Sequence, residues 1–456
     1  MRELLIGREL LAEELPTDFL ETVNLEELII ESGWVQQNKR YFCRRCGQPV
    51  AEMSPSFCTC GKSCGYCRNC IQMGRVKKCS QFYRLKAPIH PSFKPKHSFS
   101  WQGTLSEQQA LASKEIVTTI KNKTKRLLHA VAGAGKTEML FPGIYTALQQ
   151  NERICLASPR VDVCLELAPR LKAAFDQTDI AVLHGDMEES YRYTPLVIAT
   201  THQLLRFKEA FDVLIIDEVD AFPFHKDPML AYAAKKCVKV RHALIYLTAT
   251  PSKKLRRAFT PKEITTLPAR YHGYPLPEPE LIFIGDWKEK LLKTRGRPHP
   301  LIKKIAALIE KKRHFLIFLP DIAWMLAFEK RLHQLFPVVK FTSVSARDER
   351  RKEKITKMRA RDYQFLLTTT ILERGVTFPN IDVLIVGAED RLFDEAALVQ
   401  IAGRAGRSAQ YPTGQVLFYH NGRTRAMNAA LRQIKWLNQE ARKRGLLNDK
   451  VSVVRS

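Results

Sequence analysis

Residues 130–137 read Ala-Val-Ala-Gly-Ala-Gly-Lys-Thr, a run of small residues that ends in a lysine and a hydroxyl. In a loop that joins a strand to a helix, such small residues let consecutive main-chain N–H groups approach phosphate oxygens. Lys136 would neutralise the β- and γ-phosphates of ATP, and the Thr137 hydroxyl would ligate Mg²⁺. A helix onset at Lys136 would add its favourable dipole end. The candidate nucleotide-binding residues here are Ala132, Gly133, Ala134, Gly135, Lys136, Thr137 and Glu138.

Two adjacent carboxylates, Asp217 and Glu218, follow the apolar run 213–216. Because ligand-binding groups gather at the carboxyl edge of a parallel sheet, we expect Asp217 to hold Mg²⁺ through water and Glu218 to orient or deprotonate the attacking water. Carboxylates at a strand end can also simply cap a turn, but that alternative leaves the phosphate cradle upstream unexplained. Asp220 and the stretch 248–250, Thr-Ala-Thr, predict a relay in which hydroxyls at one strand end bond the carboxylate of its neighbour.

Far downstream, residues 400–407 read Gln-Ile-Ala-Gly-Arg-Ala-Gly-Arg. Phosphoryl transfer spreads negative charge over the equatorial oxygens, and an arginine supplied by a second lobe can accelerate it by ~10³–10⁵. Their spacing of three predicts that Arg404 and Arg407 share one helix face. The alternative, a basic helix that aids solubility, must also explain two glycines inside a helix, which cost about 1 kcal/mol each. The predicted catalytic residues are Lys136, Asp217, Glu218, Arg404 and Arg407.

The stretch 105–109 is expected to open a helix with Ser106 as its N-cap. An amide offers both a donor and an acceptor, so Gln109 is a candidate for reading the adenine edge, with Trp101 stacking nearby. An ordinary surface glutamine is the alternative.

Eight of the eleven cysteines fall between Cys43 and Cys79, in a chain whose first residues carry charges that break any secretory signal. In a reducing compartment this crowding indicates metal rather than disulfides. The pairs Cys43/Cys46 and Cys67/Cys70 can chelate one tetrahedral ion, and four thiolates with no open position predict a structural zinc site. Cys64 has the same spacing to Cys67, so it is an alternative to Cys70 as a ligand.

The remaining cysteines have different expected roles. The role of Cys58, Cys60 and Cys79 stays open at this point, and a redox function is one alternative. The other three lie in apolar contexts and should be buried core residues: Cys155, Cys164 and Cys237.

The elements that must position these residues are visible as short apolar runs. From residue 101 to about 270 such runs alternate with helical patterns, as expected for parallel strands buried on both faces of one α/β lobe. The proline-rich stretch 274–280 predicts a hinge. A second set of runs follows it. The predicted strands are 126–130, 154–157, 196–199, 213–216 and 243–247, then 315–319, 365–369, 383–386 and 416–419.

Two helices of the second lobe are also predicted. A strongly charged helix should cover 347–359. From Thr424 on, Met427, Leu431, Ile434 and Leu437 share one face of an amphipathic helix, whose basic opposite face is either solvated or in contact with DNA. The expected domains are 1–98, which ends in a linker at 86–97, then 99–275 and 276–456.

Composition bounds the partner and the compartment. The 456 residues include 73 Lys and Arg against 47 Asp and Glu, and 73 − 47 gives +26, which favours a polyanion, nucleic acid before anionic lipid. Solubility alone is the alternative reading of that charge. No apolar run approaches the roughly 20 residues that span a bilayer. We therefore expect a cytoplasmic protein, with a peripheral position at the inner face of the cell membrane left open.

With these residues together, the chain resembles superfamily 2 helicase-type ATPases. Further matching stretches are 158–160, 200–203, 315–320 and 368–377. The resemblance implies two RecA-like parallel-sheet lobes in tandem, here behind an N-terminal four-cysteine zinc-binding domain, that grip one strand mainly through its phosphates. The positions carried over for that grip are Arg160, Thr201 and Thr370. Such binding is salt-dependent and tolerant of sequence.

Over roughly residues 40–425 the chain is also similar to the ComFA family of transformable Gram-positive bacteria, on the stretches 66–76, 135–144, 216–223 and 397–407. The resemblance implies a cytoplasmic ATPase that helps to draw single-stranded DNA inward through the ComEC channel, with ComFC as a partner. The cofactors expected for this chain are ATP, Mg²⁺ and a structural Zn²⁺. The Tyr-Cys-X-X-Cys pattern of the family favours Cys67 and Cys70 as ligands.

Two other functions compete with this one. A PriA-like replication restart helicase also combines such lobes with zinc-binding cysteines. A nucleic-acid-binding adaptor whose ATPase has decayed is the non-enzymatic alternative, and it predicts damaged catalytic positions, whereas Lys136, Asp217, Glu218 and Arg407 are intact.

Overall fold

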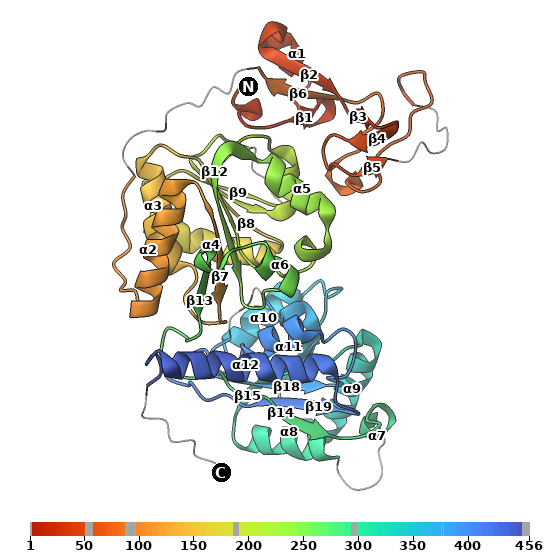
Figure 1. Cartoon of the computed structure of the whole chain (residues 1–456). Coiled ribbons are helices and arrows are strands. Elements are labelled where there is room, and N and C mark those ends of the chain that lie inside the picture. Colours follow the sequence, from red (N-terminus) through yellow and green to blue (C-terminus); the bar gives the residue numbers. More distant parts are fainter. Residues whose placement is uncertain are drawn as a thin grey trace. The chain divides into compact units, whose positions relative to one another are not determined.

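The structure is a computed structural model that describes residues 2–50, 58–86, 93, 97–185, 191–292, 299–374, 376 and 378–448 (Figure 1). Most of the predicted linker at 86–97 and Thr377 lie outside the described residues. The chain divides into two compact units. The first consists of Met1–Leu128 with Thr137–Thr265, and the second of His129–Lys136 with Thr266–Ser456.

Two small antiparallel sheets form the N-terminal part of the first unit. Their strand orders are β1-β6-β2 and β3-β4-β5. The cysteine-rich segment begins at the end of β4 and continues between β5 and β6, where residues 58–80 contain one short 3-10 helix, Ile71–Met73. The elements are β1 (Leu10–Leu11), α1 (Phe19–Thr22), β2 (Leu28–Ser32), β3 (Trp34–Gln37), β4 (Arg40–Cys43), β5 (Pro49–Val50) and β6 (Gln81–Leu85).

A seven-stranded sheet of order β13-β7-β12-β11-β8-β10-β9 forms the first RecA-like lobe. The strands from β12 to β9 pair in parallel, and all five predicted runs of this lobe are strands. The sequence did not indicate β9 and β13, because edge strands bury only part of their side chains. The strands are β7 (Lys125–Ala130), β8 (Ile154–Ser158), β9 (Ile180–Leu183), β10 (Leu196–Thr200), β11 (Phe211–Ile216), β12 (Val238–Thr248) and β13 (Ile264–Leu267).

Helices cover both faces of this sheet. Figure 1 shows α2 and α3 side by side on one face and α5 on the other. The parallel strands are therefore buried on both faces, which explains their continuous apolar sequences. The helices are α2 (Glu107–Asn122), α3 (Phe141–Gln149), α4 (Val161–Ala174), α5 (Pro228–Lys236) and α6 (Lys253–Arg257).

The second unit contains a six-stranded parallel sheet of order β14-β19-β18-β15-β17-β16. All four predicted runs of this lobe are strands. The elements are β14 (Glu280–Phe283), α7 (Lys288–Leu292), α8 (Pro300–Glu310), β15 (His314–Phe318), α9 (Ile322–Leu335), β16 (Phe341–Val344), α10 (Arg351–Arg359), β17 (Phe365–Thr368), β18 (Ile381–Val386), α11 (Glu395–Ala402), β19 (Val416–His420) and α12 (Arg425–Lys443).

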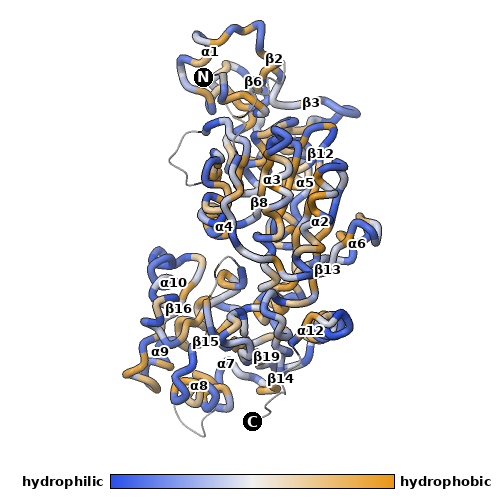
Figure 2. The backbone as a smooth tube through the Cα atoms, turned by 90° about the vertical axis from the view of Figure 1, so that its left-hand side faces the viewer, coloured by the Kyte–Doolittle hydropathy of each residue, from blue (hydrophilic) through white to orange (hydrophobic). Residues whose placement is uncertain are grey.

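Two predicted helices of this unit can be compared with the structure. The charged helix α10 begins at Arg351 rather than at residue 347, because the Asp348 carboxylate accepts the Arg350 N–H at 3.0 Å and closes a turn before the helix. Figure 2 shows hydrophilic residues along this helix. The amphipathic helix α12 is confirmed, since Met427, Ile434 and Leu437 are buried. Its buried Asn438 donates to the Leu276 carbonyl at 2.9 Å and accepts the Leu276 N–H at 2.8 Å, which holds the irregular chain after residue 271 against the helix.

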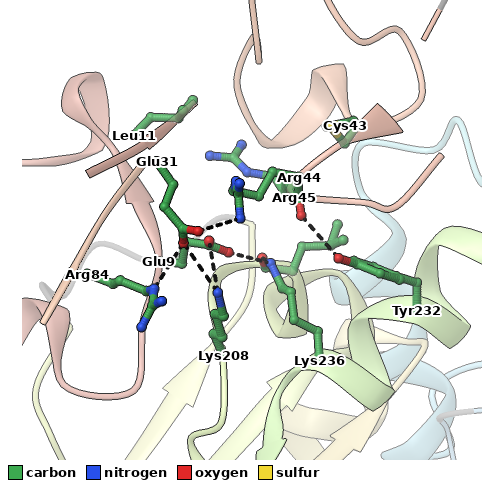
Figure 3. Close-up of polar contacts among 12 residues, drawn as sticks. Glu9, Leu11, Glu31, Cys43, Arg44, Arg45, Arg84, Lys208, Tyr232 and Lys236 are labelled. Carbon is green, nitrogen blue, oxygen red and sulfur yellow. Dashed lines mark hydrogen bonds and ion pairs between the residues drawn. The ribbon is translucent and has the colours of Figure 1, made fainter. Parts of the chain in front are cut away.

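The N-terminal part is joined to the first RecA-like lobe through main-chain contacts and buried charges. The Glu9 N–H donates to the Arg206 carbonyl at 2.9 Å, and the Lys208 N–H donates to the Gly7 carbonyl at 3.1 Å. The Glu9 carboxylate, 1% exposed, pairs with Lys236 Nζ at 3.2 Å and with Lys208 Nζ at 3.7 Å (Figure 3). Burial lowers the pKa of Lys236, so the buried ammonium depends on its carboxylate partner.

Further ion pairs extend this contact. Glu14 accepts from Arg206 Nε at 2.8 Å and from the completely buried Arg45, which also donates to the Met73 carbonyl. Glu31 accepts from Arg44 and Arg84 within the N-terminal part at 2.8 and 3.0 Å, and it pairs with Lys208 Nζ of the first lobe at 3.4 Å (Figure 3). Because Glu9, Glu14 and Glu31 each pair with a basic residue of the lobe, the N-terminal part and the lobe belong to one compact unit.

Among the described residues, no helix has both the length and the apolar character needed to cross a membrane.

Replacing Glu9 by Gln should destabilise the first unit by about 3 kcal/mol, because it leaves the buried Lys236 ammonium without a counter-charge. Urea unfolding followed by circular dichroism measures the change. The control is Glu353→Gln, which breaks an exposed ion pair with Lys357 and should leave the free energy of unfolding nearly unchanged. Equal stability of the two variants would show that the Glu9 contact does not hold the unit together.

Candidate nucleotide and metal sites

The loop after β7 has the backbone that its glycines predict. Gly133 and Gly135 have φ values of +85° and +71°, which favour glycine, and the Ala134 N–H donates to the Val131 carbonyl at 3.1 Å. The predicted helix onset at Lys136 is wrong. Helical hydrogen bonding begins with a 3-10 turn at Glu138–Leu140, and α3 follows. Thr137 already has helical φ and ψ, but its carbonyl accepts the N–H of Leu140, three residues later, instead of the N–H four residues later. This bonding pattern gives the tighter 3-10 turn.

Gln109 has a structural role in this protein. Ser106 is the N-cap of α2, as predicted, and Gln109 is the N3 residue whose side-chain oxygen accepts the Ser106 N–H at 2.8 Å. The side chain of Gln109 is buried. Its contact with adenine stays a prediction. Trp101 packs edge-on against Phe141, with ring centroids 5.6 Å apart.

The carboxylates Asp217 and Glu218 follow β11 at the carboxyl edge of the first sheet. Ile216 lies opposite Ala157 of β8, and the Asp217 N–H donates to the Ala157 carbonyl at 2.8 Å. The Glu218 N–H donates to Asp217 Oδ1 at 2.8 Å, and Glu218 has a φ of +54°. A left-handed conformation is uncommon for a residue with a Cβ, and such strain of about 1 kcal/mol is concentrated at functional sites.

The predicted relay beside these carboxylates is confirmed. The Thr250 hydroxyl donates to Asp220 Oδ2, and the Thr250 N–H donates to Thr248 Oγ1 at 2.9 Å. The end of β12 is therefore hydrogen-bonded to the segment after β11.

The three predicted nucleic-acid positions also follow strand ends. Arg160 is the N-cap of α4 after β8, Thr201 opens a 3-10 turn after β10, and Thr370 opens another after β17. Ser158 and Thr200 lie opposite each other in the β8–β10 pair, so Arg160 and Thr201 belong to the same edge of the first sheet. Arg160 and Thr370 are partly exposed, whereas Thr201 is completely buried. Arg160 and Thr370 are thus better suited than Thr201 to direct contact with a nucleic-acid strand.

The arginines Arg404 and Arg407 do not share a helix face, which corrects the prediction. Helix α11 ends at Ala402 with Gly403 as its C-cap, and Gly406 has a φ of +63°. The two glycines therefore end the helix and shape a turn. The destabilisation expected for glycine in a helix interior does not apply, because neither glycine lies inside a helix. Arg404 is 2% exposed, and its Nε donates to the Glu373 carbonyl at 3.1 Å. Arg407 Nε donates to the Gly403 carbonyl at 2.9 Å.

A third arginine, Arg270, lies at this turn and was missed. Its guanidinium is completely buried and donates to the carbonyls of Gly406 and, at 3.3 Å, Gly403. A Cβ on Gly133 would lie 3.5 Å from Arg270 Cγ, so the Arg270 side chain lies beside the glycine-rich loop 130–137. Within the second unit it therefore packs against both this loop and the turn that carries Arg404 and Arg407. Burial and the nearby charge of Arg407 lower the pKa of Arg270 to about 9. Arg270 stands in no recognisable motif, so no spacing pattern could have identified it.

His272 also hydrogen-bonds to this turn, and its two hydrogen-bond partners fix the protonation state of its imidazole. Its Nε2 donates to the Gly406 carbonyl at 3.2 Å, while its Nδ1 accepts the Tyr274 N–H at 3.1 Å. The two partners together require the neutral imidazole. Burial first, and then the charge of Arg270, lower the pKa of His272 from 6.5 to about 4.

The sulfur atoms of Cys43, Cys46, Cys67 and Cys70 form one buried group, all within 4.8 Å of one another. The Cys43 and Cys70 sulfurs are 3.7 Å apart, and those of Cys46 and Cys67 are 3.6 Å apart. Zinc–sulfur bonds of about 2.3 Å in a tetrahedron place sulfurs about 3.8 Å apart, so the group fits Zn²⁺. Cys64 belongs to a different group. The three predicted core cysteines outside this region are buried, as expected: Cys155, Cys164 and Cys237.

This cysteine group packs directly on the first lobe. Its four side chains share one hydrophobic cluster with Leu204 and Leu205 and with Met229 and Leu230, the last two from α5. A Cβ at Gly47, which has a φ of +67°, would lie 2.5 Å from a ring carbon of Tyr232, also in α5. A metal held here would therefore brace the helix that follows the carboxylate segment.

Three family models match the chain. Residues 1–84 match "Competence protein ComFA N-terminal domain", residues 102–253 match "Type III restriction enzyme, res subunit", and residues 300–409 match "Helicase conserved C-terminal domain". The chain thus carries helicase domains of the ATP-binding type.

Two relatives are competence proteins. The chain is 44% identical over 411 residues to competence protein ComFA of Bacillus subtilis (strain 168), covering 89% of this chain and 87% of that one. It is 40% identical over 412 residues to competence protein ComFA of Streptococcus pneumoniae (strain ATCC BAA-255 / R6), covering 89% and 92%.

Solved structures share the fold. The Mycobacterium smegmatis helicase Lhr bound to ssDNA and AMP-PNP gives a TM-score of 0.55 at 16% identity, over 74% of this chain and 50% of that chain. S. cerevisiae Dbp5 bound to RNA and ADP BeF3 gives 0.53 at 14% identity, over 75% and 98%. Both confirm the two RecA-like sheets.

Acid should loosen the turn that His272 holds. The pKa of His272 is lower in the folded chain than in the unfolded chain, so between about pH 6.5 and 4 the unfolded chain binds the proton more tightly. Stability contributed by neutral His272 is therefore complete above pH 6.5 and is lost as the pH falls toward 4. Urea unfolding of the second unit at several pH values should show a shallower acid loss in His272→Asn than in the unchanged protein. The exposed His225→Asn is the control and should keep the original slope. Identical slopes in all three proteins would contradict this assignment.

Proposed function

The chain belongs to the ComFA family of competence proteins, and from this premise we propose that it is an ATP-driven motor that moves along single-stranded DNA during DNA uptake. One observation carries the proposal: a chain with both helicase domains keeps every residue type that ATP hydrolysis needs. These residues lie at strand ends and turns, where they add little to the stability of the packed fold. The strained backbone of Glu218, the buried Arg404 of the 403–407 turn and the buried Arg270 that bonds to this turn support it further.

We assign each residue a role in hydrolysis. Main-chain N–H groups of the loop at Gly133 and Gly135 bind the phosphates, and Lys136 balances their charge. Mg²⁺, when bound, neutralises charge on the phosphate oxygens, with Thr137 and Asp217 as the residues that hold it. The Glu218 carboxylate orients the attacking water and accepts its proton.

The arginines act on the charge that develops during the reaction. Arg404 and Arg407 stabilise the equatorial oxygens of the transferred phosphoryl group. Arg270 acts through the turn as a positioning residue, because its hydrogen bonds go to the carbonyls of Gly403 and Gly406.

The proposed track is single-stranded DNA. A net charge of +26 supports a polyanion partner, and Arg160 and Thr370 are the residues best exposed for phosphate contact. Binding should then weaken steeply with salt and vary little with base sequence. Family membership supports ComFC and the ComEC channel as partners, and it supports a place for the protein at the inner face of the cell membrane.

We also propose that Cys43, Cys46, Cys67 and Cys70 hold a structural zinc ion. Their burial and sulfur spacing support it, and a filled tetrahedron of thiolates leaves no position for substrate. Through the shared hydrophobic cluster, this ion would stabilise α5 and the lobe beneath it.

Two substitutions test the hydrolysis step. Glu218→Gln and Lys136→Ala should each lower ATP turnover by at least ~100-fold, because they remove the proton acceptor and the phosphate counter-charge. Glu218→Gln should still bind single-stranded DNA, since the strand is held by other residues. Glu209→Gln is the matched control, because Glu209 is an exposed glutamate that also has a left-handed backbone, with a φ of +47°.

The assay is ATP hydrolysis by the full chain with single-stranded DNA, duplex DNA, RNA or no nucleic acid. The proposal predicts the largest stimulation by single-stranded DNA. Equal turnover with and without DNA would contradict a motor. Strong unwinding of branched forks would favour the PriA-like alternative, and absence of hydrolysis in the unchanged protein would favour the adaptor.

A further inference from the structure

A second group of four cysteines lies outside the buried one. The sulfurs of Cys58, Cys60, Cys64 and Cys79 all lie within 4.8 Å of one another. The Cys58 and Cys79 sulfurs are 3.6 Å apart, and those of Cys60 and Cys64 are 3.4 Å apart. These separations are close to the edge of about 3.8 Å in a tetrahedral zinc–thiolate site. They are far longer than the roughly 2.05 Å of a disulfide, and all four cysteines are free thiols.

The local chain is shaped to bring these sulfurs together. Gly61, with a φ of +76°, donates its N–H to the Cys58 carbonyl at 2.9 Å, and the Cys58 N–H donates to the Lys62 carbonyl at 3.2 Å. This tight turn places Cys58 and Cys60 on the same side as Cys64. A glycine with a left-handed φ serves the same purpose in the first group, where Gly47 donates to the Cys43 carbonyl at 2.8 Å.

A short antiparallel ladder links the two groups. The Cys67 N–H donates to the Val76 carbonyl at 2.9 Å, and the Lys78 N–H donates to the Gly65 carbonyl at 3.1 Å. Cys67 of the first group and Cys79 of the second therefore extend from one ladder. The two groups are also interleaved along the chain, because Cys58, Cys60 and Cys64 lie between the two pairs of the first group.

Apolar burial does not explain the second group. Of residues 58–66, all of which the structure describes, Cys64 alone is buried. A segment with so little core cannot hold four side chains in convergence by packing, and small cysteine-rich segments usually rely on a metal or disulfides for this.

The two groups differ in exposure. Each sulfur-bearing side chain of the first group is at most 1% exposed, whereas Cys60 and Cys79 of the second are exposed and Cys58 is half-buried. Solvent and competing ligands can reach the second group directly. The first is covered by the hydrophobic cluster that it shares with the first lobe.

We propose that Cys58, Cys60, Cys64 and Cys79 bind a second zinc ion, at a solvent-accessible site that exchanges its metal faster than the buried site does. Four thiolates in a tetrahedron select Zn²⁺ among the abundant divalent ions, because oxygen-preferring cations are excluded. The site is structural. It ties the 58–64 turn to the end of the ladder at Cys79, and it is independent of the ATP-hydrolysis residues.

The first test is the metal content of the full chain, purified in reducing buffer without chelator and analysed by mass spectrometry of the elements. The proposal predicts two zinc ions per chain. The double variant Cys60→Ser/Cys79→Ser should contain one, since it removes two of four ligands. The control Cys237→Ala, which removes a buried thiol outside both groups, should retain two. One zinc in the unchanged protein, iron in place of zinc, or a Cys58–Cys79 disulfide in peptide mapping would overturn the proposal.

The second test separates the two sites by rate. With 4-(2-pyridylazo)resorcinol as competing chelator, the unchanged protein should release one zinc at least ~10-fold faster than the other, because one set of ligands is exposed and the other is covered. The fast phase should be absent from Cys60→Ser/Cys79→Ser while the slow phase remains. That remaining slow phase also shows that the N-terminal part of the variant is folded. A fast phase that persists in the variant would assign rapid exchange to the buried site and contradict the proposal.

Discussion

Parallel pairing of β8 with β10 and β11 determines where chemistry can occur in the first lobe. Because Ser158 lies opposite Thr200 and Ala157 lies opposite Ile216, every segment that follows these strands leaves the sheet at the same edge. The carboxylates, Arg160 and the hydroxyl relay of Thr250 all belong to that edge. A shift of one strand by a single residue would turn its side chains to the opposite face and break this arrangement. The apolar strands therefore position the functional residues, which contribute little to the hydrophobic core themselves.

The second constraint is the burial of charge without loss of its partners. Glu9 with Lys236 and Glu14 with Arg206 join the N-terminal part to the first lobe. In the second unit, Arg270 is buried against main-chain carbonyls and beside Arg407, so a site of high positive charge is kept in a poorly solvated place. Such a place favours binding of an anion with several charges, because the guanidinium groups of Arg270 and Arg404 are already shielded from water. In our account the anion is the triphosphate of ATP.

Much of this fold could be predicted from the sequence, since continuous apolar runs such as 154–157 and 213–216 have few structural alternatives to a buried parallel strand. The glycine-rich loop and the two cysteine pairs were also recognisable, because their chemistry requires particular spacings. The spacing of three between Arg404 and Arg407 predicts a shared helix face, but Gly403 ends the helix and Gly406 adopts a positive φ, so the arginines lie on a turn. Arg270 and the second cysteine group could not be assigned, since each depends on residues that only the folded chain brings together.

The central claim is that an arginine of the 403–407 turn and the phosphate-binding loop act on the same nucleotide. The most direct measurement compares ATP binding and single-turnover hydrolysis in Arg407→Ala. The account predicts that hydrolysis falls by about 10³-fold while the dissociation constant for ATP changes by less than about tenfold, since this arginine stabilises mainly the transition state. Hydrolysis at the rate of the unchanged protein would contradict the claim.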